Sequence, residues 1–406
     1  MGALDGVRVI EIANWAAVPS AGVLFAEEGA EVIKIEPPSG DSMRGLMHQA
    51  SVESSAEVDH PFQFSNRDKL SVAIDIRVAS GAELVRELIG TADIVLINLL
   101  RGRRAKYGLS VEEIRSRFPS VIIGVLTGFG DVGPDADVPG YDLTSFFARS
   151  GLSSSISGRG GYPPRWRAAQ GDHVAGLALF GGVMAALFER ERTGEGCVVE
   201  TSLLQAATWS NAFDLTRAAV DGRPATAKGR EGAVNAPSEC FRCSDDRFVQ
   251  LSLAEPVGGW RIVCDVLGRE DLHDDARFDD VVKRFRNMAL LLEILDVEFA
   301  KHPSADIVDA IVERGGVAAL VLTTDEVVGD PQIEALGVLR PVTHPDGDFD
   351  VVGPPFRPRH VRASVPAIGA PGADTEEVLR RLLGLSGSQI SDLEAGGVVV
   401  VRSREA

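Results

Sequence analysis

Cysteine is scarce in this chain, with four among 406 residues, and long apolar runs are absent. The first residues have no basic stretch followed by an apolar run, and no uninterrupted apolar run approaches the roughly 18 residues that cross a bilayer. Cys240 and Cys243 form a C-x-x-C pair without the second Cys/His pair of a zinc site, so we interpret them as reduced thiols. We therefore expect a cytoplasmic protein with no membrane partner and no metal.

Positive charge is also in deficit. The chain has 41 lysines and arginines against 59 aspartates and glutamates, which gives a formal net charge of −18. Such an acidic protein repels nucleic acid, so we expect no nucleic-acid partner. An anionic ligand would need a local basic patch that opposes the overall charge.

Short segments rich in Val and Ile alternate with amphipathic segments through the first half of the chain. The expected strands are 6–12, 31–36, 71–76, 93–97, 121–126 and 198–201, and the expected helices are 19–28, 80–89, 111–117, 175–192 and 203–220. This alternation predicts an α/β fold with a parallel sheet covered on both faces, in a doubly wound, Rossmann-like arrangement. The G-x-G-x-x-G fingerprint is missing after the first strand, so we expect no nicotinamide cofactor.

A change of composition divides the chain. Residues 1–220 form the first part of the large Rossmann-like domain, and the Gly- and Pro-rich stretch 221–237 has the composition of a linker. A strand at 248–253 and helices at 260–267 and 288–300 predict a smaller α+β domain over 238–325. Residues 326–406, with helices at 374–383 and 388–394, are expected to return and complete the large domain.

Several segments, in order along nearly the whole chain, resemble the family III CoA-transferases of the CaiB/BaiF type. They include LDGVRVIEIA, GAEVIKIEPPSGD, NRDKLSVAIDI, ADIVLIN, PGYDL and GDHVAGLALFGGVMAALFERERTGEG. The resemblance implies an enzyme that moves CoA from an acyl-CoA thioester to a free carboxylic acid, with CoA as substrate and product. It also implies a CoA-binding large domain and an interlocked homodimer.

Asp172 is the residue on which the predicted chemistry depends. A carboxylate attacking a thioester forms a mixed anhydride and releases a thiolate, so a chain of covalent intermediates is a natural route. We expect Asp172 just before a long helix, whose dipole and free N–H groups favour the ionised form. An aspartate there is also a common N-cap, and the pattern alone favours that structural role. The resemblance reverses this choice, because Asp172 falls at the family's nucleophile.

Tyr141 is the second catalytic candidate. By resemblance, the racemase branch of the family has a histidine at this position, paired with the aspartate. A tyrosine hydroxyl, which ionises only near pH ~10, is a poor base for an α-proton, so Tyr141 favours transfer over racemisation. His173 is a helix neighbour of Asp172 and points about 100° away from it, so we expect a structural role.

Cations gather in the first domain despite the overall charge. Arg101, Arg104 and Lys106 belong to a basic loop after the fourth strand, at the sheet edge where ligands of open α/β sheets bind. By resemblance, Asn98 and Lys106 fall at CoA-contacting positions, and Asn66 and Lys69 lie near the adenosine. A solvated charge run is the alternative for each arginine.

Two departures from the family leave the acyl group open. Ala16 and Ala17, our remaining CoA-binding candidates, stand where the family often has Ala-Gly-Pro, sometimes preceded by a glutamine near the thioester. The glycine-rich loop of formyl-CoA transferase has no full counterpart here, and Gly258-Gly259-Trp260 is a short candidate for it. An acyl-CoA racemase or epimerase, or a catalytically silent CoA-binding homologue, therefore remain as alternatives.

Overall fold

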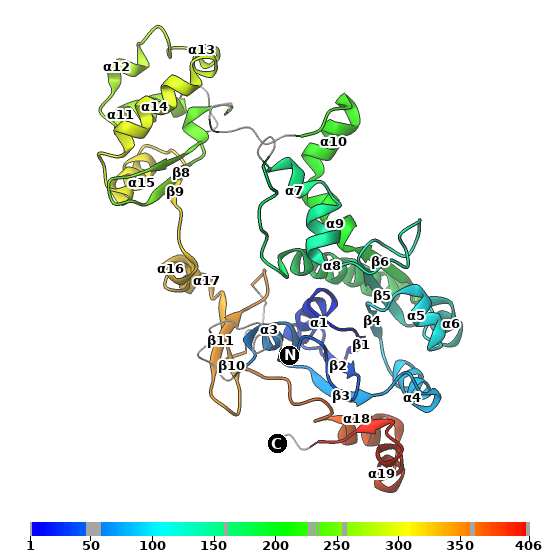
Figure 1. The fold of residues 1–406 in the computed structure, drawn as a ribbon. Helices are drawn as coiled ribbons and strands as arrows, with labels where there is room; N and C mark the ends of the chain where they lie inside the picture. The colour runs from blue at the N-terminus through cyan, green and yellow to red at the C-terminus, as the bar shows by residue number, and fades with distance from the viewer. Residues whose placement is uncertain are drawn as a thin grey trace. The chain divides into compact units, whose positions relative to one another are not determined.

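The computed structural model describes residues 2–45, 58–157, 161–225, 230, 233, 235–253, 258–357 and 362–402. The chain divides into two compact units. Unit 1 comprises Met1–Ser155, Pro164–Ala225 and Gln332–Ala406, and unit 2 comprises Ile156–Pro163 and Thr226–Pro331. Unit 1 therefore combines the two ends of the chain, blue and red in Figure 1.

A seven-stranded sheet forms the centre of unit 1, in the order β13-β3-β2-β1-β4-β5-β6. Six of its strands run parallel, and β13 pairs antiparallel with β3. The strands are β1 Arg8–Ile12, β2 Glu31–Glu36, β3 Leu70–Ile74, β4 Ile94–Ile97, β5 Ile122–Thr127, β6 Val198–Ser202 and β13 Val399–Val400. The α/β class and the large parallel sheet are thus as predicted. The strand order reverses at β1 and β4, the point where ligands of open sheets bind.

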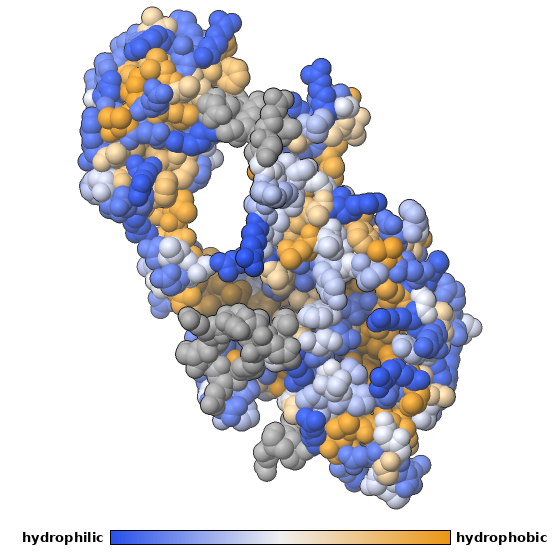
Figure 2. Space-filling model, viewed as in Figure 1, coloured by the Kyte–Doolittle hydropathy of each residue, from blue (hydrophilic) through white to orange (hydrophobic). Residues whose placement is uncertain are grey.

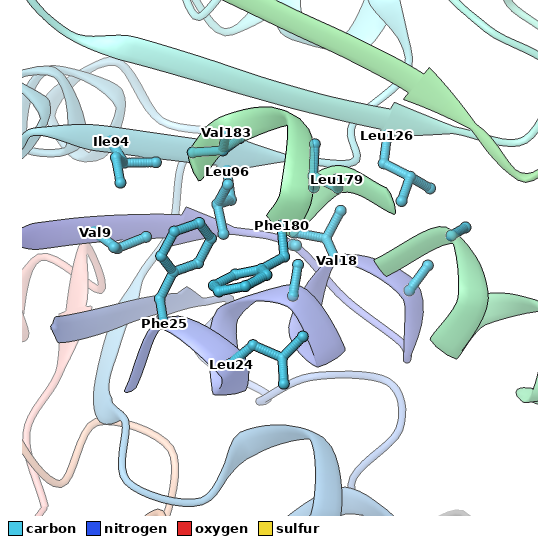
Figure 3. Packing of buried hydrophobic residues seen from close by; sticks show 14 of the residues in the cluster. Val9, Val18, Leu24, Phe25, Ile94, Leu96, Leu126, Leu179, Phe180 and Val183 are labelled. Carbon is cyan, nitrogen blue, oxygen red and sulfur yellow. The ribbon is translucent and has the colours of Figure 1, made fainter. Parts of the chain in front are cut away.

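Alternate strand residues fill two separate cores, one on each face of the sheet. Val9 and Leu96 face helices α1 (Ala17–Glu27), α8 (Gln170–Thr193) and α9 (Leu203–Ser210). Figure 3 shows this first core, where the rings of Phe25 and Phe180 meet edge to face at 4.8 Å. The neighbouring strand residues point to the opposite face of the sheet, where they form the second core. The helices on that face are α4 Ala79–Ile89, α6 Val111–Arg117, α18 Thr375–Leu383 and α19 Gly387–Ala395. Burial on both faces explains the continuous Val/Ile runs in the sequence.

Helix α8 begins at Gln170, five residues before its predicted start, and ends at Gly194 in the left-handed conformation. Of the helices in the part of the chain that the structure describes, it is the one long and apolar enough to cross a membrane by length and composition. Here it is a core helix that packs on the sheet and on α1. At Gly176 an added Cβ would lie 2.1 Å from Ser20 Oγ and 2.5 Å from the Ala17 carbonyl oxygen, so this close crossing requires glycine.

Two other local predictions were wrong. The helix expected over 203–220 is two helices, α9 and α10 (Ala212–Asp221), that meet at Asn211. Near the break, the Ser210 hydroxyl donates to the Ala206 carbonyl oxygen at 3.1 Å, a bond that often bends helices. The basic run expected as a loop forms the short helix α5 (Arg101–Lys106).

The remaining elements of unit 1 are short. They are α3 His60–Asn66, the π-helix η1 Asp142–Ala148, α7 Leu152–Ser155, α17 Pro331–Leu336 (which begins at the unit boundary), and the strands β10 Leu339–Thr343, β11 Phe349–Val352 and β12 Val365–Pro366. The last three form a separate small sheet in the order β11-β10-β12.

Within its described residues, unit 2 has an antiparallel sheet in the order β7-β8-β9, five main helices and two short ones. Its elements are η3 Ala236–Ser238, β7 Cys240–Arg242, β8 Phe248–Leu251, α11 Gly258–Val266, α12 Glu270–His273, α13 Val281–Arg286, α14 Met288–Phe299, α15 Ser304–Glu313, β9 Ala318–Leu320 and α16 Thr324–Val328. Gly258 and Gly259 open α11, and the Trp260 side chain is buried in the core of this unit. The four cysteines are free thiols.

Candidate functional site

Asp172 lies inside the first turn of α8, and not before the helix as the sequence predicted. The N-cap is Ala169, which takes a left-handed φ of 70° and has no side chain that could cap the helix. Burial raises the pKa of the Asp172 carboxyl to about 7, and the nearby Asp142 carboxylate adds to the rise. Near neutral pH this carboxyl group is therefore divided between its protonated and its ionised form.

Asp142 is a residue that the sequence analysis did not single out, although it follows Tyr141 directly. It opens η1, is 4% exposed, and accepts a hydrogen bond at Oδ1 from the Leu143 N–H at 2.7 Å. Burial raises its pKa, while the backbone N–H groups of Ala169 and Gly171 favour the ionised form. By stricter distance and angle criteria, Oδ2 has no hydrogen-bond partner among the described residues. The start of α8 thus holds two carboxyl groups in each other's field.

Gly171 allows η1 and the first turn of α8 to pack closely together. A Cβ at this position would lie 2.6 Å from Cγ of Phe146 in η1, so only glycine allows η1 to pack against the first turn of α8. Gly171 is therefore needed for packing, and its neighbour Asp172 provides the carboxyl group.

Tyr141 lies at the surface beside the loop that follows β1. Its ring is 56% exposed and meets the Trp15 ring edge to face, with the centroids 5.6 Å apart. Trp15 belongs to a small apolar cluster, called here the Trp15 cluster: buried Ala16, Met43, Phe62 and Ile368 with partly buried Trp15 and Ala169. Because Ala169 is the N-cap of α8, the cluster joins the loop after β1 to the start of the Asp172 helix.

Ala16 and Ala17, two of the predicted CoA-binding residues, form the N-terminus of α1. Both are buried, and the Ala17 carbonyl oxygen accepts a hydrogen bond from the Ser20 hydroxyl at 2.8 Å. Ala16 belongs to the Trp15 cluster, so it lies close to the start of α8. His173 packs edge to face on Phe64 with ring centroids 4.9 Å apart, which supports the structural role expected for it.

Asn66 and Lys69 lie in a buried polar network under the same loop, and not at an open surface. Lys69 Nζ donates to Glu11 Oε2 at 2.7 Å, to the Pro19 carbonyl oxygen at 2.8 Å and to Asn66 Oδ1 at 3.1 Å. Burial lowers the pKa of Lys69 to about 8. These contacts use the polar groups of both residues inside the protein.

The Asn98 side chain is also used inside the protein, where its amide joins the loop after β4 to the loop after β1 through two hydrogen bonds. Asn98 Nδ2 donates to the Asn14 carbonyl oxygen at 2.7 Å, and Asn98 Oδ1 accepts from the Asn14 N–H at 3.3 Å. These bonds cross the point of the sheet where the strand order reverses.

The predicted basic patch is split by the turn of α5. Arg104 is 1% exposed and pairs with Asp131 inside the protein. Arg101 is exposed and lies 3.6 Å from Asp137, and Lys106 is exposed beside the Tyr107 ring. Of the three predicted cations, Arg101 and Lys106 are thus available to a ligand.

A pocket of about 210 Å³ lies at the carboxyl ends of β1 to β4. Its cations are Arg103, from the basic run, and Arg77, which the sequence analysis overlooked. Its lining is Ile12, Ala13, Asn14, Ile35, Glu36, Pro37, Ser39, Ile74, Asp75, Ile76, Arg77, Leu99, Arg103 and Tyr107. The rule that ligands bind where strand order reverses could have indicated this pocket. The loop after β1 separates it from the Trp15 cluster, since Asn14 lines the pocket and Trp15 joins the cluster.

Comparison with known proteins identifies the family. The family model described as CoA-transferase family III matches residues 4–375. The chain belongs to CoA-transferase family III. As a member of this family of enzymes, it has coenzyme A as its expected substrate, and its homologues act on acyl-CoA and carboxylic acids.

Relatives of this family III protein include characterised transferases. The (R)-2-hydroxy-4-methylpentanoate CoA-transferase of Clostridioides difficile is 30% identical over 98% of this chain and 99% of its own length. The cinnamoyl-CoA:phenyllactate CoA-transferase of Clostridium sporogenes is 34% identical over 68% of each chain. The crystal structure of a CaiB/BaiF family protein from Brucella suis is 27% identical, with a TM-score of 0.81 over 94% of this chain and 99% of that one.

This family III protein has no evident metal centre in the part of the chain that the structure describes. No group of three or more His, Cys, Asp or Glu side chains there could hold a metal ion. The chemistry that the described site offers comes from the Asp172 and Asp142 carboxyl groups, the Tyr141 hydroxyl and the pocket cations.

Proposed function

We propose that this enzyme transfers CoA from an acyl-CoA thioester to a free carboxylic acid through covalent intermediates on Asp172. The observation that carries the proposal is the half-buried Asp172 carboxyl with a pKa of about 7 in the first turn of α8. A carboxylate with a raised pKa is a stronger nucleophile than an ordinary aspartate, and a large fraction of it is ionised at neutral pH.

The reaction balances in four steps. An Asp172 oxygen attacks the thioester carbonyl, the C–S bond breaks, and a mixed anhydride and the CoA thiolate form. The thiolate attacks the aspartyl carbon of the anhydride, which releases the donor acid and leaves an aspartyl-CoA thioester. The acceptor carboxylate then displaces CoA from this thioester, and the thiolate attacks the acceptor acyl carbon of the new anhydride. The acceptor leaves as its CoA thioester and Asp172 is regenerated.

We place the nucleotide end of CoA in the pocket at the carboxyl ends of β1 to β4. Arg103 lines this pocket and suits a phosphate or pyrophosphate, and Arg77, which pairs with Asp75 at 2.7 Å, lines it too. Exposed Arg101 and Lys106, on the same short helix as Arg103, add positive charge around it. The loop after β1 then lies between the nucleotide and the Asp172 carboxyl, so the pantetheine arm would pass along it.

We infer that two copies of the chain associate into the interlocked homodimer that the sequence predicts. Helices α8, α9 and α10 expose large apolar side chains that a monomer would leave in water, among them Trp209 at 84% and Phe213 at 95% exposure. Helix α10 has no buried residue. In Figure 2 orange and tan residues appear over α9 and α10 among the blue ones. Exposed apolar patches of this kind mark protein interfaces.

Trapping of the acyl-enzyme tests the mechanism. The enzyme is incubated with a panel of acyl-CoA thioesters and treated with hydroxylamine or borohydride, and peptides are analysed by mass spectrometry. We expect modification at Asp172, and Asp172→Ala should lower transfer by about a thousandfold or more while CoA binding remains. Transfer by an enzyme whose Asp172 is never modified would overturn the mechanism.

Exchange of the α-proton is the second candidate, and the closeness of two carboxyl groups favours it. Asp172 and Asp142 could act as an acid and a base on opposite sides of an acyl α-carbon. Incubation with an acyl-CoA in deuterium oxide, without an acceptor acid, separates the two functions. Deuterium at the α-carbon would indicate a racemase or epimerase, whereas transfer alone leaves the acyl group unlabelled.

A further inference from the structure

Trp15 has a backbone conformation that a tryptophan rarely adopts. Its φ is 68°, in the left-handed region that favours glycine and disfavours bulky side chains. Ala169, the N-cap of α8, has a φ of 70°, and both residues pack in the Trp15 cluster. Two residues in a disfavoured conformation therefore belong to one cluster at the start of the Asp172 helix, and such conformations concentrate at functional sites.

A buried charge network holds Trp15 in this conformation. The Trp15 N–H donates to Asp41 Oδ1 at 3.1 Å. The other Asp41 oxygen lies 2.8 Å from Lys34 Nζ, which also donates to Glu11 at 3.0 Å, and the three charged side chains are fully buried. The loop is therefore fixed to the sheet strands β1 and β2, and the position of the indole ring is fixed with it.

The indole ring lies next to Tyr141, in the cluster that includes the N-cap of the Asp172 helix. It meets the Tyr141 ring at an interplanar angle of 82°, so the two rings are nearly perpendicular. Tyr141 is the more exposed residue of the two. Tyr141 precedes Asp142, whose charge acts on Asp172, and Ala169 precedes α8 by one residue. Glycine would satisfy the backbone at position 15, so the presence of tryptophan indicates a use for its ring.

We propose that Trp15 is a specificity-determining residue that selects an acyl group with an aromatic ring. This proposal rests on the proposed transfer at Asp172, because it assigns the wall against which the transferred acyl group lies. The perpendicular Trp15 and Tyr141 rings offer an aryl group a face and an edge, which is the geometry that aromatic rings prefer. A short acyl chain such as acetyl has no ring to pack against either aromatic side chain.

The charges around the Trp15 cluster disfavour the competing class, dicarboxylic acyl groups. Asp172 and Asp142 are both acidic, and a second carboxylate on the acyl chain would be repelled by them. Among the described residues, two cations near the cluster are already paired: Arg44 binds both Glu36 oxygens at 2.7 Å, and Lys34 binds Glu11 and Asp41. Exposed Arg167, two residues before Ala169, is the cation that a dicarboxylic group would use instead.

The test compares kcat/KM for three donors, the CoA thioesters of 3-phenylpropanoic, acetic and succinic acid, in the wild type, Trp15→Gly and Trp15→Phe. Trp15→Gly removes the ring and suits the left-handed backbone, and Trp15→Phe keeps an aromatic ring. We expect the wild type to prefer the aryl donor. Trp15→Gly should lower kcat/KM for the aryl donor by about 10- to 100-fold, whereas kcat/KM for the acetyl donor should change by less than about threefold. Trp15→Phe should restore most of the preference.

Two results would overturn the proposal: an equal loss for all three donors in Trp15→Gly, or a wild-type preference for the succinyl donor that Arg167→Ala removes. A binding measurement separates this from failure of the mechanism. Calorimetry with unreactive thioether analogues in Asp172→Ala should show tighter binding of the aryl analogue, lost on adding Trp15→Gly. If the aryl analogue binds more tightly but transfer continues without Asp172, the role of Trp15 stands and only the Asp172 mechanism is overturned.

Discussion

At Asp172 a carboxyl group lies where burial and a second carboxylate oppose its ionisation. In the proposed mechanism the ionised form of Asp172 is the nucleophile, and its fraction rises with pH through the pKa of about 7. We therefore expect kcat/KM for the acyl donor to fall about tenfold per pH unit below this value and to level off above it. Steady-state rates between pH 5 and 9 measure this dependence.

Asp142→Asn should move the acidic limb of that profile to lower pH. The substitution removes a negative charge that raises the pKa of Asp172, so ionisation becomes easier. Asp392→Asn, an exposed carboxylate on α19, is the control and should leave the profile in place. An acidic limb that stays at the same pH in Asp142→Asn would show that the two carboxyl groups do not interact.

Arg103→Ala should weaken binding of CoA without changing the chemistry. Loss of one charge-assisted contact to a phosphate is expected to raise KM for the acyl-CoA about tenfold, with kcat within about twofold. The control is Arg115→Ala, an exposed arginine on α6 that does not line the pocket. Equal effects of the two substitutions would argue against the pocket as the nucleotide site.

At the scale of elements, the crossing of α1 and α8 positions the start of the Asp172 helix. Gly176→Ala should destabilise the protein by about 1–3 kcal/mol, because its Cβ would overlap Ser20 Oγ and the Ala17 carbonyl oxygen. Gly181→Ala in the same helix has no atom within 4 Å of the new Cβ, and should raise stability by up to about 1 kcal/mol. Urea unfolding midpoints compare the two variants. Equal shifts would mean that helix propensity, and not the crossing, decides the effect.

Hydrophobic periodicity predicted most elements, since a buried strand or an amphipathic helix is visible in its own residues. Strand β2 and helix α6 lie where the sequence placed them. The early start of α8 was missed because Gln170 and Gly171 are polar or small and carry no periodic signal. The break at Asn211 was missed because the apolar pattern continues across it.

At the scale of the whole molecule, the prediction concerns the number of copies. Sedimentation velocity should show a particle of twice the 43.2 kDa chain mass. Phe213→Asp places a charge on the exposed apolar face of α10 and should shift the protein toward monomer. Val312→Asp, an exposed valine of unit 2, is the control. A monomeric wild type, or a dimer unaffected by Phe213→Asp, would argue against this interface.

By itself, the sequence determined the α/β class and the parallel sheet, and it placed Asp172 next to a long helix, although the structure puts the residue inside the first turn. These features depend on local periodicity and on a helix terminus, and both are encoded within a few consecutive residues. The ordered motifs also determined the family, because they extend along the whole chain.

Only the tertiary structure decided which charged residues face a ligand. Lys69 and Arg104 are buried because Glu11 and Asp131 neutralise them, and these partners are distant in sequence. Asp142 acts on Asp172, and Trp15 meets Tyr141, through the same kind of long-range approach. A charge or ring in a sequence has no fixed partner until the chain folds, so its role depends on contacts that local patterns do not encode.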